Sequence, residues 1–441
     1  MLKFILSLSF LYFIYLKWWI IFVFIMFIFI FFFINSINLF YWRNLYNFLA
    51  LDFLSLSIIL LRFWICSLII LARFKLYYLN KFRNLFILNL LFLLLCLVLA
   101  FSSLDILYFY VFFEIRILPV LLIIIGWGYQ PERIQAGIYL VFYTLFVSLP
   151  LLLGIFYIYN VFYSFRFIYF NELGLIIIYF LIILAFLVKM PIFIFHLWLP
   201  KAHVEGPVSR SIILAGVILK LGGYGLIRLI KLILIVSLKI NLIWIILSLV
   251  GGRLISLICL HQIDMKLLIA YSSVVHIALV IGGIFTLTYY GFIGRLILII
   301  GHGLCSSGLF VLINLIYERL GRRSLIINKG LINLLPNLSL WWFLLLSSNI
   351  AAPPSINLFG EITLLIRIIY WSKYSIFFLI FISFFRAGYR LYIFAFSQHG
   401  VYFKGLFDFR GINIREFLLL FLHWIPLNLL ILKIDYFFFW M

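Results

Sequence analysis

The stretch LIIIYFLIILAFLVKMPIFIFHLWLP, residues 175–200, decides the fold class of this chain. Its first part, from Leu175 to Val188, is apolar on every side and lacks the polar stripe of a helix that packs on a soluble core. The stretch from Ile20 to Ile34 has the same character. Lipid is the natural solvent for such segments, so we expect helices that span a membrane.

The composition of the whole chain indicates the same class. Of 441 residues, 68% are hydrophobic and 10% are charged, against roughly 25% charged in soluble domains, and the mean hydropathy is +1.30. A spanning helix needs about 20 apolar residues, which predicts an all-α polytopic membrane protein with about fourteen transmembrane helices. We expect them near residues 4–16, 18–35, 50–72, 84–102, 104–125, 134–159, 172–199, 208–232, 238–258, 266–286, 291–317, 337–371, 376–397 and 415–434. Lys17 alone divides the first two, so one long tilted helix, and about thirteen helices in all, is the alternative.

Residue usage also indicates where the chain is made. Phe, Tyr, Ile and Leu far outnumber Ala and Val, a bias that AT-rich codons produce in many organelle genomes, which favours synthesis in mitochondria. The N-terminus carries no Arg-rich presequence, and its apolar run is too long for a removable secretory signal, so we expect it to be retained as a membrane anchor.

The net charge of +21 is distributed as in a membrane protein. Lys and Arg occupy short loops and helix ends and form no single solvated stripe, so nucleic acid is not an expected partner. The positive-inside rule explains the excess. With fourteen helices, both termini lie on one side of the membrane, and most loop cations lie on the opposite side, which we expect to be the matrix side. These cations are Arg73, Lys75, Lys81, Arg83, Arg319, Arg322, Arg323, Lys329, Lys404 and Arg410.

The four cysteines, Cys66, Cys96, Cys259 and Cys305, show no CxxC spacing and lie in apolar surroundings. We expect small buried core residues, with no disulfide and no iron–sulfur site.

Four charged residues lie inside apolar segments, where each costs several kcal/mol without a partner or water. They are Glu114 in YVFFEIRILPV, Lys189 in LAFLVKMPIF, Lys220 in AGVILKLGGYG and Glu361 in PPSINLFGEITLL. A structural ion pair or a snorkelling side chain explains any one of them, but snorkelling requires a position near a helix end. The four together favour a function that moves charge.

Prolines predict that two of the charged helices are broken. Pro191 follows Lys189, and Pro354 precedes Glu361 by seven residues. A proline removes a backbone donor and frees a carbonyl, which is tolerated at membrane depth only where the backbone lines a cavity. The pair Gly222–Gly223 after Lys220 similarly allows close packing or a local distortion.

Two histidines add groups that titrate near neutral pH. His276 is central in SSVVHIALV and His302 in LIIGHGLCSSGLF; a buried core histidine is the alternative, and the company of Lys220 and Glu361 favours a proton relay. His196 and His203 are separated by Pro200, so no metal site is expected there. The chain shows neither haem-ligand spacing nor a phosphate-binding GxGxxG after a strand, so we expect no cofactor in it.

Longer phrases around these residues resemble a known family. They are GWGYQPERIQAGIYLVFYTLFVSLPLLLG, KMPIFIFHLWLPKAHVEGPV, VILKLGGYGLIRL, DMKLLIAYSSVVHIALV, GHGLCSSGLFVLINLIYERL and APPSINLFGEI. They are similar to the antiporter-like proton-channel subunits of respiratory complex I, the NADH:ubiquinone oxidoreductase, and most of all to the mitochondrial subunit 4 family. The resemblance covers nearly the whole chain; the first 45 residues and the tail after about 400 match only in hydrophobic character, apart from REFLLLFLHWIPL.

The resemblance implies an organisation. Two inverted repeats of five helices, each with one broken helix, would occupy residues 84–232 and 238–397. N-terminal helices would precede them in residues 1–83, and a loop and a last helix would follow in residues 398–441.

The resemblance also implies roles for the charged residues. Glu114 and Lys189 would form an intramembrane ion pair, and Lys220 would be the central proton carrier. His276 and His302 would connect to the second half, and Glu361 would sit at the outlet.

The implied function is proton translocation coupled to electron transfer from NADH to ubiquinone. Flavin, iron–sulfur clusters and ubiquinone would lie in other subunits, and a changed field at Glu114 would open or close the ion pair and alter the proton affinity of Lys220. Expected partners are other membrane-arm subunits and membrane lipids, with cardiolipin as a candidate, in the mitochondrial inner membrane.

Two arginines depart from the family pattern. Arg116 and Arg210 stand where small or apolar residues are usual. Arg116 is two residues from Glu114 on the helix, so we expect it to face a neighbouring subunit or lipid headgroups and not the channel. The alternative is that Arg116 competes for Glu114.

Two other functions are alternatives to the one that the resemblance implies. A subunit of a cation/proton antiporter shares the charged residues. A membrane scaffold with a purely structural role is the other alternative.

Overall fold

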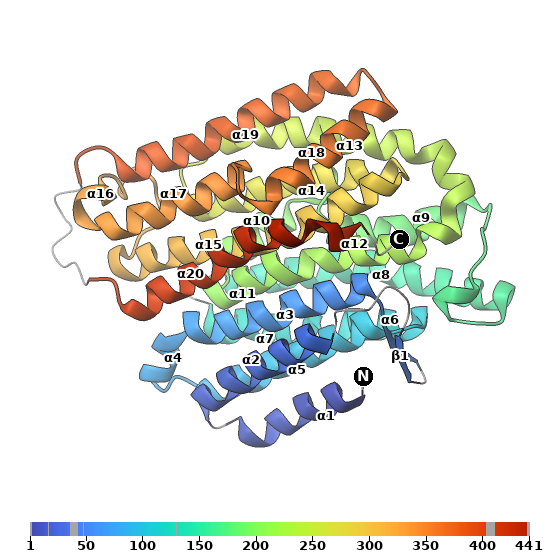
Figure 1. Ribbon diagram of the computed structural model, residues 1–441, viewed down its shortest axis with the longest axis horizontal. Helices are drawn as coiled ribbons and strands as arrows, with labels where there is room; N and C mark the ends of the chain where they lie inside the picture. Colours follow the sequence, from blue (N-terminus) through green and yellow to red (C-terminus); the bar gives the residue numbers. More distant parts are fainter. Residues whose placement is uncertain are drawn as a thin grey trace. The chain divides into compact units, whose positions relative to one another are not determined.

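The computed structural model describes residues 2–15, 17–35, 43–46, 48–128, 130–402 and 411–438. The chain forms two compact units. Figure 1 shows its helices, coloured along the sequence. Unit 1 comprises Met1–Lys189, Glu205–Lys239 and Phe438–Met441, and unit 2 comprises Met190–Val204 and Ile240–Phe437. Lys404 and Arg410, expected among the basic loop residues, lie outside the described residues.

Unit 1 is built from apolar helices and one small hairpin. In chain order its elements are α1 (Leu2–Leu11), η1 (Tyr12–Ile14), α2 (Trp18–Asn35), β1 (Arg43–Tyr46), β2 (Leu49–Leu51), α3 (Phe53–Ala72), α4 (Phe74–Tyr78), α5 (Arg83–Ser102), α6 (Ile106–Ile115), α7 (Ile117–Trp127), α8 (Arg133–Phe162), η2 (Phe167–Tyr169), α9 (Ile176–Lys189), α11 (Val208–Ile213), the π-helical η4 (Leu214–Ile218), α12 (Leu219–Leu229), η5 (Ile230–Ile233) and the start of α13 (Leu234–Leu260). Helix α3 packs on α2, α5 and α11, and α9 packs on α8 and α12.

The first two helices form an antiparallel pair. The ring of Phe4, near the start of α1, lies 3.5 Å from the ring of Phe32 and 5.7 Å from that of Phe31, near the end of α2, measured between ring centroids. The chain therefore reverses between the two helices. One long tilted helix, the alternative left open by the sequence, is excluded.

Helix α3 begins later than residue 50, where the sequence predicts its start. Leu49–Leu51 form the strand β2, which pairs antiparallel with β1. The side chain of Asp52 accepts a hydrogen bond from the N–H of Ser55, and the hydroxyl of Ser55 lies 2.9 Å from the Asp52 nitrogen, which is a capping box. Asp52 also forms an ion pair with Arg228 of α12, at 2.6 Å. The N-cap thus fixes where α3 begins and ties it to α12.

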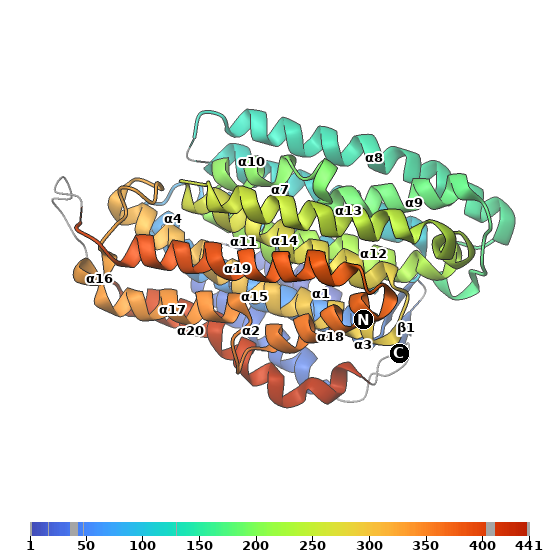
Figure 2. The same cartoon turned by 90° about the horizontal axis from the view of Figure 1, so that it is seen from above.

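Unit 2 contains most of α13 and the later helices. Its elements are η3 (Phe193–Phe195), α10 (Trp198–Glu205), α13, α14 (Met265–Phe285), α15 (Tyr289–Leu320), α16 (Leu331–Leu334), α17 (Pro336–Ile350), α18 (Ile356–Trp371), α19 (Ser375–Gln398), α20 (Ile414–Leu429) and η6 (Leu430–Phe437). Helix α15 is the centre, because it packs against α14, α17, α18 and α20. Figure 2 shows α17 and α18 end to end, with a loop between them.

Small residues let α15 and α18 approach closely. A Cβ added at Gly360 of α18 would lie 3.0 Å from the nitrogen of Leu298 and 3.2 Å from the oxygen of Gly294, both backbone atoms of α15. Backbone atoms in a packed helix cannot rotate away as a side chain can. The close approach matters for the site, because Gly360 directly precedes Glu361.

The number of spanning helices depends on how long helices are divided. Among the described residues, nine helices are long and apolar enough to cross a membrane, and Ile176–Lys189 and Phe193–Glu205 pass the same test only together. Val208–Leu260 counts as one of the nine, although it has 53 residues. At 1.5 Å per residue this is about 80 Å, more than twice the thickness of a hydrocarbon core of about 30 Å. The apolar helices Phe4–Ile14 and Trp18–Ile34 are shorter than the threshold. The chain is thus a helical membrane protein.

Gly360→Ala should loosen the contact between α15 and α18. The added methyl group meets two backbone atoms of α15, so we expect a cost of about 1–3 kcal/mol and less assembled protein at raised temperature. Gly388→Ala in α19 is the matched control, because an added Cβ there has nothing within 4 Å. Thermal denaturation of the purified native assembly measures both; equal behaviour of the two variants would contradict the close-approach argument.

Candidate functional site

The predicted helix breaks are confirmed. Helix α9 ends at Lys189, and the next helical residues are Phe193–Phe195 of η3. Helix α17 ends at Ile350, and α18 begins at Ile356, five residues before Glu361. Lys189 is the last residue before its break, and Glu361 lies in the second helical turn after its break. Charged residues near helix breaks at membrane depth are typical of ion sites.

In unit 1 the structure brings Glu114 and Lys189 together. The Nζ atom of Lys189 lies 3.5 Å from Oε1 of Glu114 and 4.5 Å from the centre of the Phe113 ring. Lys189 is 1% exposed. Glu114 comes from α6 and Lys189 from the end of α9, so the pair joins two segments that are distant in sequence. A buried ammonium with one carboxylate and one aromatic face is stabilised while the carboxylate stays charged.

Lys220 is a separate buried cation of unit 1. It is the second residue of α12 and lies two residues after the end of the π-helical segment Leu214–Ile218. A π-helical turn inside an α-helix is rare, leaves the i→i+4 hydrogen-bond ladder locally irregular, and is frequent at functional sites. The helix is thus distorted near Lys220, before the lysine, whereas the sequence allowed either close packing or a local distortion through Gly222–Gly223. Arg62 of α3 is close enough to Lys220 for electrostatic repulsion.

In unit 2 the structure gathers the other three predicted site residues. The rings of His276 in α14 and His302 in α15 are 4.9 Å apart between centroids. Nδ1 of His276 lies 3.6 Å from Oε1 of Glu361 in α18. All three side chains are buried. Three helices therefore contribute one titratable group each to a compact cluster.

Asn349 and two arginines join this cluster without having been singled out in the sequence. Oδ1 of Asn349, in α17, lies 3.0 Å from Nε2 of His276. Arg386 of α19 donates to Glu361, and Arg390, one helical turn later, contacts Nε2 of His276. The signal for the arginines was present in SFFRAGYRLYIF, where two cations four residues apart interrupt an apolar helix. Asn349 carries no such signal, because a single amide in an apolar segment is common.

The expectation for Arg116 was wrong. Its side chain is buried in the chain and does not face a neighbouring subunit or headgroups. Nε donates to the carbonyl of Phe113 at 2.8 Å, and the guanidinium lies over the Phe113 ring. The rotation expected on a regular helix fails here because α6 ends at Ile115 and α7 begins at Ile117, so a direction extrapolated from helical periodicity does not hold. Arg210 is also fully buried.

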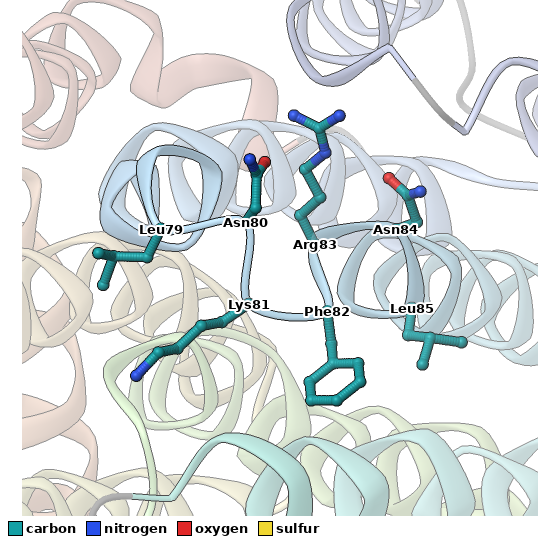
Figure 3. Close-up of a pocket in the computed structure, with 7 residues that line it drawn as sticks. All are labelled: Leu79, Asn80, Lys81, Phe82, Arg83, Asn84 and Leu85. Atoms are coloured by element: carbon teal, nitrogen blue, oxygen red, sulfur yellow. The ribbon is translucent and has the colours of Figure 1, made fainter.

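The cysteines and the surface pocket are not part of the two buried clusters. All four cysteines are free and buried, as predicted. In the described residues no group of three or more His, Cys, Asp or Glu side chains could hold a metal ion. A surface pocket is formed by the consecutive residues Leu79–Leu85 between α4 and α5, shown in Figure 3. None of the predicted site residues lines it, so it has no part in the buried clusters.

The fold and the buried charges define a polytopic α-helical membrane protein with titratable groups at membrane depth. Comparisons with known proteins narrow this class. Residues 103–386 match the family described as NADH:quinone oxidoreductase/Mrp antiporter, TM, and residues 1–100 match NADH-ubiquinone oxidoreductase chain 4, amino terminus.

Relatives and a solved structure agree with this. The chain is 57% identical to NADH-ubiquinone oxidoreductase chain 4 of Ceratitis capitata, over 90% of each chain, and 52% identical to that of Aedes aegypti, over 100% of each. Its fold is similar to a chain of respiratory complex I from Thermus thermophilus, with a TM-score of 0.82, 23% identity, and coverage of 94% of this chain and 91% of the other. The chain belongs to the NADH-ubiquinone oxidoreductase chain 4 family.

Asn349→Ala should disturb the His276 cluster without unfolding unit 2. Loss of the amide oxygen removes a hydrogen-bond partner of the imidazole and leaves the ring less fixed opposite Glu361, so proton transfer should fall several-fold. The number of protons moved per NADH oxidised measures the effect. Asn333→Ala, at an exposed position of α16, is the control; an unchanged ratio in Asn349→Ala would show that the amide does not hold the histidine.

Proposed function

We propose that the chain is a proton-translocating membrane-arm subunit of NADH:ubiquinone oxidoreductase. The observation that carries this is the buried Glu114–Lys189 pair at a helix break, within a chain of the chain 4 family. Electron transfer from NADH to ubiquinone takes place in other subunits, which hold the flavin, the iron–sulfur clusters and the quinone. The chain supplies groups that bind and release protons.

The Glu114–Lys189 pair acts as the switch. Two charges 3.5 Å apart in a weakly polar surrounding interact far more strongly than in water. A change of field at Glu114 therefore alters how firmly Lys189 holds its proton. Lys220, the central carrier, then binds or releases a proton as the balance of charge around it changes.

The cluster in unit 2 carries the proton further. A proton leaves one imidazole nitrogen of His276 as another arrives at the second, since both ring nitrogens can exchange protons. Glu361, 3.6 Å from Nδ1, is the next acceptor, at the outlet. His302, beside His276, is the preceding group.

The finer architecture follows the same proposal. About fourteen crossings at about 20 apolar residues each form two inverted five-helix repeats, at 84–232 and 238–397. The chain lies in the mitochondrial inner membrane beside other complex I subunits and lipids, including cardiolipin, with its basic loops facing the matrix.

Trypsin added to the outer face of mitoplasts should leave the loop at Lys81 uncut, because the basic loops face the matrix. Lys81 is exposed, so folding does not protect it. Opening the membrane should allow cleavage there, as judged by peptides of this subunit. Cleavage from outside would reverse the orientation.

A cation/proton antiporter subunit is the second candidate, because the family matched by residues 103–386 includes Mrp antiporters by its description. The two are separated by co-purification and by cation dependence. Flavin and iron–sulfur absorbance in a particle much larger than the chain supports the first. Proton movement that requires Na⁺ and proceeds without NADH supports the second.

Lys220→Ala should abolish or greatly reduce proton pumping while the complex still assembles. The variant deletes the central carrier and leaves a small residue that α12 tolerates well. Lys231→Ala, at an exposed position of η5, is the control for loss of a lysine. NADH-driven proton uptake by membrane vesicles measures the effect, and normal uptake in Lys220→Ala would refute the relay.

Glu114→Gln should make the switch stick in one state. Glutamine keeps the shape and hydrogen-bonding capacity but removes the charge, so the Lys189 ammonium is left buried without its carboxylate, a loss on the order of 3–5 kcal/mol. Glu114→Asp keeps the charge at shorter reach and should retain part of the activity.

Glu172→Gln, an exposed carboxylate, is the control for Glu114→Gln. Coupled quinone reduction and proton transfer are measured together in each variant. Wild-type coupling in Glu114→Gln would exclude the ion-pair switch. Equal loss in Glu114→Asp and Glu114→Gln would show that geometry and not charge controls the step.

A further inference from the structure

Two groups of arginines in this chain differ in their surroundings. Members of the first have polar partners: Arg228 pairs with Asp52 at 2.6 Å, Arg319 pairs with Glu416, and Arg323 donates to the carbonyl of Val204 at 2.7 Å. Members of the second, Arg62, Arg210 and Arg295, are 0% exposed. Within the described residues, none of their three guanidinium nitrogens has a hydrogen-bond partner.

Two members of the second group lie against aromatic rings, and the third, Arg210, is close enough to Glu205 for electrostatic attraction but has no hydrogen bond in the described chain. The guanidinium of Arg62 lies over the Phe101 ring at 4.7 Å, and that of Arg295 over the Phe292 ring at 4.5 Å. Arg62, in α3, and Arg295, in α15, both lie within candidate membrane spans. Snorkelling is excluded, because no part of these side chains reaches the surface.

A guanidinium is a poor occupant of such sites. It stays charged in proteins and presents five N–H donors. A buried, unpaired charge costs several kcal/mol even after relaxation. Arg62 is also close enough to Lys220 to repel it, so a permanent cation there opposes protonation of the group that carries the proton.

A serine would be satisfied at each of these positions. Serines elsewhere in the helices donate to a carbonyl three or four residues earlier: Ser67 to Trp64 at 2.6 Å, Ser273 to Ala270 at 2.7 Å and Ser306 to His302 at 2.6 Å. A helical hydroxyl thus needs no tertiary partner. A hydroxyl near Lys220 can also donate and accept, as a proton pathway requires.

The genetic code links arginine to serine at these positions. Arthropod mitochondria translate the codons AGA and AGG as serine and AUA as methionine, whereas the standard code assigns arginine and isoleucine. Relatives at 57%, 52% and 53% identity come from Ceratitis capitata, Aedes aegypti and Locusta migratoria. The composition shows the same effect for the codon AUA, because the chain has only 5 methionines in 441 residues and abundant isoleucine.

We propose that positions 62, 210 and 295 carry serine in the protein that mitochondria make, because AGA or AGG encodes them. The inference rests on mitochondrial synthesis, which is part of the proposed function. Arg116, Arg386 and Arg390 each also leave guanidinium nitrogens without a hydrogen-bond partner in the described chain, and their codons decide them in the same way. His276 also contacts Asn349 and Glu361, which are not arginines.

The test is to sequence the gene and the native subunit. The subunit is isolated within the intact complex, digested with chymotrypsin, which does not depend on arginine, and its peptides are sequenced by tandem mass spectrometry. We expect AGA or AGG codons and serine at positions 62, 210 and 295. Arg228, Arg319 and Arg323 are the matched controls, with CGN codons and arginine.

Two results would overturn the inference. Arginine in the native peptides at any of the three positions shows that the chain tolerates these buried cations. CGN codons there exclude reassignment. Both readouts come from the chain itself and not from its activity. Normal pumping by Lys220→Ala would refute the relay without affecting the serine assignment. Arginine in the native peptides would refute the serine assignment without affecting the relay.

Discussion

The chain is organised by the cost of placing a charge at membrane depth. Water is absent there, so backbone and side-chain polar groups must find partners within the protein. Lys189 meets this requirement through Glu114 and the Phe113 ring. It can do so only because α9 ends at that residue, which sets the lysine beside a second helix and leaves the backbone beyond it outside any regular helix.

The two units satisfy their charges in different ways. Unit 1 holds the ion pair of Glu114 with Lys189 and, separately, Lys220, which follows a π-helical turn. Unit 2 holds a cluster in which His276 touches both an amide and a carboxylate. A lone pair suits a switch with two states, while neighbouring titratable groups suit stepwise transfer. The close packing of α15 on α18 through Gly360 keeps the members of the second cluster in reach of one another.

The buried arginines without hydrogen-bond partners in the described chain do not follow this rule. Lys189 and Glu361 have charged partners, whereas the guanidinium groups of Arg62 and Arg295 lie against aromatic rings and have no hydrogen-bond partner among the described residues. Serines at those positions would lower the net charge and remove a fixed cation from the neighbourhood of Lys220.

The sequence by itself determined the membrane class, the approximate helical segments, both helix breaks and the identity of the titratable residues. These follow from local composition: apolar length, proline position and a charge inside an apolar run act over a few residues. Tertiary structure alone decided that α1 and α2 fold back on each other, that Arg116 turns inward, that Asn349 contacts His276, and that Glu114 reaches Lys189 at 3.5 Å. Such contacts join residues far apart in the chain, and their distances depend on how helices pack, which no local pattern encodes.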